Sequence, residues 1–301
     1  MTVNVQPPAL RELAGLLDRA REDVEKSKTH LAKIQGFAGG EGVLNQIVGG
    51  HQAAYQSLDH WLGQLANPTL TSVSQAVGDS ARYYETTDGT AAENLDRTYP
   101  ETNVTEIREH TGYTTIEPPE STARFGDVSE PTAHLVEPKD YRGELDGTPN
   151  WWDLFSPMAQ IGNAIETVSE VAVWLGWLDN PYDPQAELVK PFVGDWAGVR
   201  AAADVLRGVG HAVHGVGTNI NWASQSTDVV WQGNAGAGVT VYLMNMARPL
   251  DEIWAPIDKL AGEYVRAAEE MVTLRDASVN ILNQIGDAAI QAAVACGIGA
   301  G

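Results

Sequence analysis

Four long stretches of the sequence carry apolar or small side chains at spacings that alternate between three and four residues. This spacing aligns the side chains along one side of an α-helix, and such a line, called a seam below, must be covered by another helix. A seam of thirty residues would form a rod of roughly 45 Å, at ~1.5 Å per residue. The chain is therefore predicted to be all-α, an elongated helical bundle made of two long helical hairpins.

The first hairpin is predicted within residues 1–99. Its first seam consists of Leu10, Leu13, Leu17, Ala20, Val24, Ser27, Leu31 and Ile34, and its second of Leu44, Ile47, His51, Ala54, Leu58, Trp61 and Leu65. The glycine-rich stretch 36–42 separates the two seams and predicts a turn. Asn67-Pro68 should interrupt the second helix, because proline lacks a backbone donor. The helix is expected to restart and continue through Leu70, Val73, Val77, Tyr84, Ala91 and Leu95.

The second hairpin is predicted within residues 151–301, preceded there by an additional helix at 155–178. Its first seam consists of Val199, Ala202, Leu206, Val209, Val213, Val216, Ile220, Ala223, Thr227 and Val230, with Asp195 as a possible N-cap. Its second runs through Met246, Leu250, Ile253, Ile257, Leu260, Tyr264, Ala267, Met271, Leu274, Ser278, Ile281, Ile285, Ala288 and Ala292. Pro249 and Pro256 should kink this arm or delay its start.

Residues 100–150, between the hairpins, contain six prolines, eleven carboxylates and four basic groups, without a sustained helical or strand period. This composition predicts an acidic, Pro-rich linker or an extended wrap over a surface. The run "GYTTIE" could also pair as a short strand. The expected domains are therefore 1–99, 100–150 and 151–301.

Charge and targeting features limit the classes of partner. The formal net charge of −21 opposes binding to nucleic acid and to anionic lipid. The N-terminus lacks the basic segment and apolar core of a cleavable signal peptide. No uncharged apolar run is long enough for a transmembrane segment. We expect a soluble chain.

The sequence offers no recognisable catalytic, cofactor or metal constellation. His211 and His214 stand three residues apart without further ligands nearby, and His51 occupies a seam position, as expected for a histidine satisfied within an interface. The C-terminal "GIGAG" lacks the strand and helix that flank a phosphate-binding loop. Cys296 is the only cysteine, so there is no internal disulfide. We expect no enzyme, no cofactor and no metal.

Between the two seams of the second hairpin stands Trp231-Gln232-Gly233. A tryptophan at a hairpin apex can cap a bundle, and glycine permits backbone conformations that other residues disfavour. With this triplet on its turn, 194–296 resembles the Trp-x-Gly (WXG) superfamily of helical hairpins exported by type VII (ESX) secretion systems. Members of that superfamily carry a second export signal, Tyr-x-x-x-Asp.

The first hairpin carries such a signal at Tyr84 and Asp88. Residues 1–99 resemble the secretion-associated hairpins of the same systems, whose tail reads Tyr-x-x-Thr-Asp-x-x-x-Ala-x-x-Leu. The matching residues are Tyr84, Thr87, Asp88, Ala92 and Leu95. On a continuous helix, Tyr84 and Asp88 would lie side by side on one face. The resemblance implies a secretion signal made of Trp231, Gly233, Tyr84, Asp88 and Thr87.

The resemblance implies a non-enzymatic type VII secretion substrate or targeting module, cytoplasmic before export and then secreted or held in the cell envelope. Its partner would be the secretion ATPase or machinery, with a small WXG-type helical protein or a second copy also possible. One alternative is the targeting and chaperoning region of a polymorphic toxin whose catalytic domain lies beyond residue 301. Another is a secreted, self-assembling structural protein.

In related pairs the two signals come from different subunits and meet at one end of a four-helix bundle. We therefore expect hairpin 9–96 to pack antiparallel to hairpin 196–292, with Tyr84 near Trp231 and the turn at 36–42 far from it. Covering the apolar seams in this way would be worth several kcal/mol each, at ~25 cal/mol per Å².

Overall fold

The computed structural model describes residues 3–36, 43–111, 124–145 and 194–295. The chain forms two compact units. Unit 1 comprises 1–33, 55–137 and 205–260, and unit 2 comprises 34–54, 138–204 and 261–301. Helices dominate the described residues and the two strands are very short, so the all-α prediction is confirmed.

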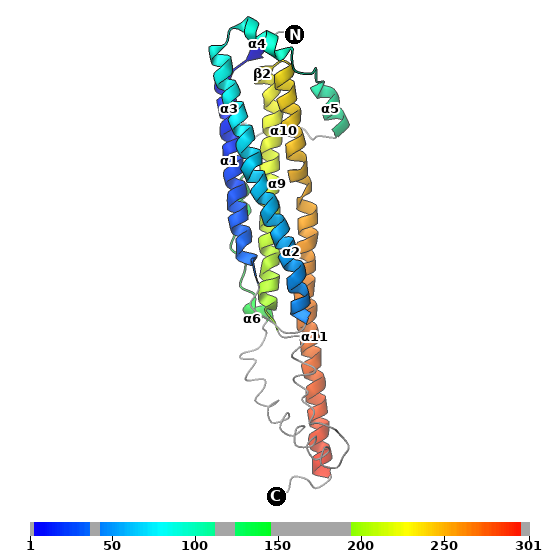
Figure 1. Cartoon of the computed structure of the whole chain (residues 1–301). Helices are drawn as coiled ribbons and strands as arrows, with labels where there is room; N and C mark the ends of the chain where they lie inside the picture. Colours follow the sequence, from blue (N-terminus) through cyan, green and yellow to red (C-terminus); the bar gives the residue numbers. More distant parts are fainter. Residues whose placement is uncertain (1–2, 37–42, 112–123, 146–193, 296–301) are drawn as a thin grey trace. The chain divides into compact units, whose positions relative to one another are not determined.

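The elements of the first hairpin follow one another as Figure 1 labels them. They are β1 (Asn4–Val5), α1 (Pro7–Leu31), the short 3₁₀ helix η1 (Ala32–Ile34), α2 (Val43–Gln64), the π-helical turn η2 (Leu65–Leu70), α3 (Thr71–Thr86) and α4 (Gly89–Asp96). Asn67 has a non-helical backbone next to Pro68, so the predicted interruption is confirmed.

The rest of the described chain contains seven elements. They are α5 (Val104–Thr111), the 3₁₀ helix η3 (Pro131–His134), α6 (Arg142–Leu145), α9 (Trp196–Val230), β2 (Trp231–Gln232), α10 (Asn234–Glu252) and α11 (Trp254–Ala295). The break between α10 and α11 lies between Pro249 and Pro256, as predicted. Pro256 falls in the first turn of α11, where its missing N–H breaks no intrahelical bond.

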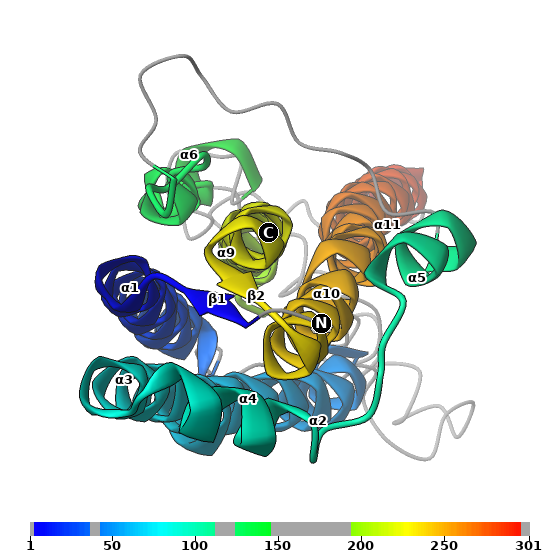
Figure 2. The same cartoon turned by 90° about the horizontal axis from the view of Figure 1, so that it is seen from above.

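Unit 1 contains α1, α3, α10 and the part of α9 from residue 205 onward. Helices α1, α3, α9 and α10 lie side by side in Figures 1 and 2. Every predicted seam residue of α1 and α9 is buried. Within unit 1, α9 is buried on more than one side, with Val205 and Ala212 inside in addition to its seam. It is therefore the helix around which the others of unit 1 pack.

Within unit 1, α1 and α9 are antiparallel, as expected for the two hairpins. At one end the backbone N–H of Gln6 donates to the carbonyl of Val230 at 2.9 Å. At the other end His30 lies beside Gly208, where an added Cβ would be 3.6 Å from the imidazole Nε2. The contact between the hairpins thus runs lengthwise through this unit.

The seam predicted for α2 is only partly correct. His51 and Leu65 are buried, but Ala54, Leu58 and Trp61 are intermediate, and Tyr55 and Leu62 are the buried residues instead. The buried line therefore shifts by one position along the helix. A seam read from sequence assumes a straight helix against a single neighbour, whereas the real line follows the helices that actually pack against it.

A second correction concerns the helix through Tyr84 and Asp88, which is not continuous. Helix α3 ends at Thr86, Thr87 has an extended backbone, and α4 begins after Asp88. The new helix has a new phase, so the predicted seam residues Ala91 and Leu95 are exposed, and Ala92 and Asp96 are buried.

Part of the acidic segment packs on unit 1. Arg19 of α1 donates to both carboxylate oxygens of Asp127 and to the carbonyl of Phe125. The side-chain amide of Asn219, in α9, accepts from the backbone N–H groups of Val128 and Ser129, both at 2.9 Å. Residues 125–129 are thereby fixed to two helices that lie far apart in sequence.

Unit 2 contains the buried histidine of the second seam. The Nε2 atom of His51 lies 2.6 Å from the carbonyl of Ile34, and its Nδ1 lies 2.8 Å from the Tyr264 hydroxyl. Because a carbonyl only accepts, Nε2 donates and Nδ1 accepts from the phenol. Asp195 caps α9, accepting the backbone N–H of Gly198 at 2.8 Å, as predicted.

Several expectations fall on residues outside the described part of the chain. These are the turn at 36–42 for all but its first residue, the strand at "GYTTIE", the helix at 155–178, Cys296 and "GIGAG". Among the helices that the structure does describe, none has an apolar stretch long enough to cross a bilayer.

Candidate functional site at the Trp-x-Gly turn

The Trp-x-Gly triplet joins α9 to α10 in unit 1. Trp231 and Gln232 form β2, which pairs antiparallel with β1, so that Asn4 lies opposite Gln232 and Val5 opposite Trp231. Trp231 is only 4% exposed, whereas Gln232 is exposed. The turn therefore buries Trp231 and leaves Gln232 exposed at the surface.

Gly233 is required at this turn for two physical reasons. Its φ of +130° lies in a region that side-chain-bearing residues rarely adopt. In addition, a Cβ at this position would lie 2.7 Å from the Oδ1 atom of Asp96. The glycine thus allows a carboxylate from α4 to approach the backbone closely.

The ring of Tyr84 packs edge-to-face on the Trp231 indole, with centroids 5.8 Å apart and an interplanar angle of 79°. The predicted proximity of Tyr84 to Trp231 is therefore confirmed. Burial raises the pKa of the Tyr84 phenol above its ordinary value. The nearby Trp231 indole partly lowers the same pKa. Its buried N–H makes no hydrogen bond to any residue that the structure describes.

Asp88 does not lie beside Tyr84 on one continuous helix, contrary to what its spacing indicated. Its carboxylate accepts the backbone N–H of Ala91 at 2.9 Å, so it is the N-cap of α4. Its side chain and that of Tyr84 therefore do not share the face of one helix. Asp is a strong N-cap residue because it satisfies a backbone donor left free at a helix start, which favours a break here. Thr87 forms the extended link between the two helices.

Asp96 is the residue of this site that the sequence did not reveal. The residue is 3% exposed, and its two carboxylate oxygens accept the backbone N–H groups of Asn234 and Ala235, each at 2.9 Å. The side-chain amide of Asn234 donates in turn to the carbonyls of Asp96 and Tyr99. Asp96 lies four residues after Ala92, on the buried side of α4. The predicted seam ran through Ala91 and Leu95 instead, so the spacing from Ala92 was the only sequence signal for Asp96.

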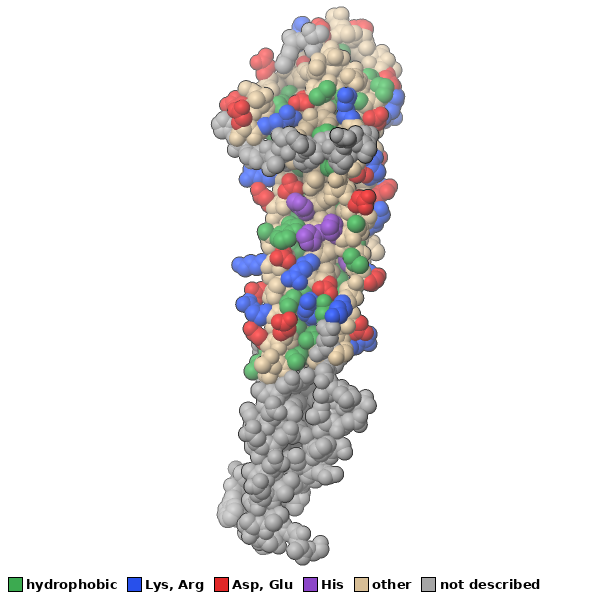
Figure 3. Space-filling view, turned by 180° about the vertical axis from the view of Figure 1, so that it is seen from behind, with side chains coloured by type: hydrophobic (Ala, Val, Ile, Leu, Met, Phe, Trp, Pro, Cys, Tyr) green, Lys and Arg blue, Asp and Glu red, His purple; other side chains and the backbone are tan. Residues whose placement is uncertain are grey.

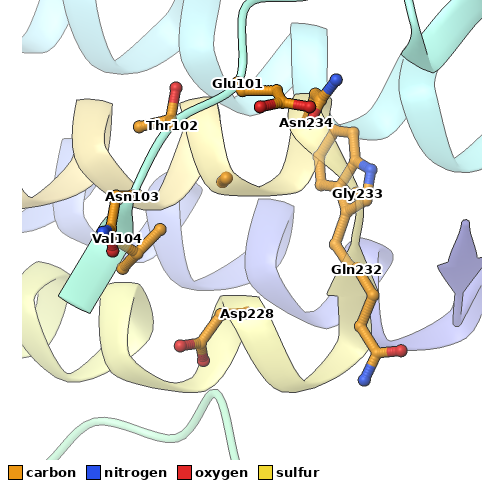
Figure 4. Close-up of a pocket in the computed structure, with 10 residues that line it drawn as sticks. Glu101, Thr102, Asn103, Val104, Asp228, Gln232, Gly233 and Asn234 are labelled. Atoms are coloured by element: carbon orange, nitrogen blue, oxygen red, sulfur yellow. The ribbon is translucent and has the colours of Figure 1, made fainter. Parts of the chain in front are cut away.

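A pocket of about 750 Å³ lies beside the turn. Figure 4 shows Glu101, Thr102, Asn103 and Val104 along one side, Asp228 of α9 along another, and Gln232, Gly233 and Asn234 across a third. Asp228 pairs with Arg108 of α5 at 3.1 Å. The turn is thus accessible from the side that α4 does not cover.

The histidines considered as metal ligands make other contacts. His211 stacks on His134 with centroids 5.2 Å apart, and its Nδ1 accepts the indole N–H of Trp254 at 2.7 Å. His214 faces the Asp251 carboxylate at 3.6 Å. Histidines gather in one area of the face in Figure 3. The described residues contain no group of three His, Cys, Asp or Glu suited to a metal ion.

A comparison with known protein families finds a match for the first hairpin. Residues 1–97 match the family described as "Excreted virulence factor EspC, type VII ESX diderm". This match supports a type VII secretion substrate. The EspC match covers α1 to α4 and so includes Tyr84, Asp88 and Asp96. No curated protein and no solved structure matches the chain.

Proposed function

We propose that this chain is a non-enzymatic type VII secretion substrate whose export signal is a composite of the Trp-x-Gly turn and the end of the first hairpin. The observation that carries the proposal is the packing of Tyr84 on Trp231, at 5.8 Å between ring centroids. Two motifs separated by more than a hundred residues thereby form one patch. The EspC match over 1–97 supports the export of the chain independently of this contact.

The two halves of the patch would play different parts in recognition by the secretion machinery. Trp231 is buried and Tyr84 half-buried, so they would set the shape of the patch. Asp88 and Gln232 are exposed and would be available to a receptor. In this chain the first hairpin would supply what a separate partner subunit supplies in the related pairs.

Export of variants from a bacterium with a type VII system tests this proposal. The fraction of chain in culture filtrate is compared with that in the cell lysate. Tyr84→Ala should abolish export, because it removes the ring that contacts Trp231. Tyr242→Ala is the matched control, since Tyr242 on α10 is 49% exposed. Equal export of the two variants would contradict a signal centred on Tyr84.

A pair of substitutions at Asp88 separates recognition from helix capping. Asparagine caps helices about as well as aspartate, so Asp88→Asn keeps the start of α4 but removes the charge. Asp88→Ala removes both, at a cost of about 0.5–2 kcal/mol in helix stability. If the carboxylate is recognised, both variants should fail to be exported. Export of Asp88→Asn at the normal level would leave Asp88 with a structural role only.

A further inference from the structure

We propose that Asp96 is the positioning residue that joins the two halves of the signal, so that the Trp-x-Gly turn takes its form only when α4 is docked on α10. This inference rests on the proposed function, because it assigns a condition under which that signal exists. The secretion machinery would then meet the composite patch on an assembled bundle and not on a partly folded chain.

The first support is the geometry of the carboxylate. Its two oxygens accept the N–H groups of Asn234 and Ala235, which stand at the start of α10. These N–H groups have no partners within their own helix, and the helix dipole favours a negative charge at this point. A helix start is usually capped by the residue just before it, but Gly233 has no side chain and α10 has no cap of its own.

The second support is burial. Asp96 is 3% exposed, and a buried carboxylate is costly unless it is hydrogen-bonded. Its carboxylate accepts from backbone N–H groups of α10, which belong to the other half of the chain. Separation of α4 from α10 would therefore leave both a helix start and a carboxylate without these partners within the protein. The cap and the docking of the two halves are coupled.

The third support is the glycine itself. A Cβ at Gly233 would meet the Oδ1 of Asp96 at 2.7 Å and its Cγ at 2.9 Å. The Asp96 carboxylate thus occupies the space that a side chain at residue 233 would need. The glycine and the aspartate act as a pair that spans the two halves of the chain.

Hydrogen exchange on the purified full-length chain tests the inference without reference to export. Asp96→Ala should accelerate exchange of the Asn234 and Ala235 amides by about tenfold or more, because it removes the acceptor of both N–H groups. Asp96→Asn should accelerate it less, because one carbonyl oxygen remains to accept one of the two N–H groups. Glu93→Ala is the control, since it removes a different carboxylate from α4. If Asp96→Ala fails to fold, Asp96→Asn alone decides the test.

The outcomes separate this inference from the proposed function. Unchanged exchange at both amides in the Asp96 variants would overturn the role of Asp96. Faster exchange together with lost export supports both ideas. Faster exchange with normal export supports the role of Asp96 and counts against the turn as part of the export signal.

Discussion

Two glycines of α10, Gly236 and Gly238, offer a sharp test of how tightly the Trp-x-Gly turn is packed. They lie two residues apart in the same helix, and each can be replaced by alanine. A Cβ at Gly236 would lie 1.8 Å from the carbonyl oxygen of Trp231 and 3.0 Å from its Cδ1 atom. A Cβ at Gly238 would meet nothing within 4 Å. The same substitution therefore has opposite expected effects.

The magnitude follows from these two distances. Alanine in a helix is favoured over glycine by about 1 kcal/mol, so Gly238→Ala should stabilise unit 1 by roughly 0.5–1 kcal/mol. Gly236→Ala has the same intrinsic gain but collides with backbone, which cannot move aside as a flexible side chain can. Overpacking of this kind typically costs 1–3 kcal/mol, and a contact this short places Gly236→Ala at or above the upper end.

Urea unfolding followed by far-ultraviolet circular dichroism measures both changes on the full chain. The expected result is a higher urea midpoint for Gly238→Ala and a lower one for Gly236→Ala than for the parent chain. Hydrogen exchange around Trp231 should also increase in Gly236→Ala. Equal stabilisation by the two substitutions would refute the close approach of α10 to the Trp231 carbonyl.

Two further predictions concern stability. Leu17→Ala should lower the free energy of unfolding by about 2–5 kcal/mol in urea titrations, because Leu17 on α1 is 0% exposed. A loss below about 1 kcal/mol would contradict that burial. Burial lowers the pKa values of three histidines below 6.5. They are His30, His51 and His211. Since the unfolded chain then binds protons more readily than the folded chain, stability should fall as the pH decreases from about 7 to 5. Asp251, whose pKa burial raises, opposes this trend; replacing His51 by Gln should make thermal unfolding less dependent on pH.

The helices of this protein were predictable from local pattern. In α1 and α9 every predicted seam residue is buried, because a regular spacing of three and four forces those side chains onto one side whatever the neighbours are. The stops at Pro68 and between Pro249 and Pro256 were equally local, since proline changes the backbone of its own turn. Sequence motifs also brought Tyr84 and Trp231 together, through the resemblance to secreted hairpins.

Only the tertiary structure shows which contacts hold the Trp-x-Gly turn and the end of the first hairpin together. The sequence could not separate Asp88 as a helix cap from Asp88 as one member of a pair on a helix face, because both use the same spacing. It could not single out Asp96, whose partners are backbone N–H groups more than a hundred residues away. The shift of the buried line in α2 has the same origin. A seam records which side of a helix is apolar, but the exact buried residues and the long-range caps depend on which helices meet, and on the angle between them.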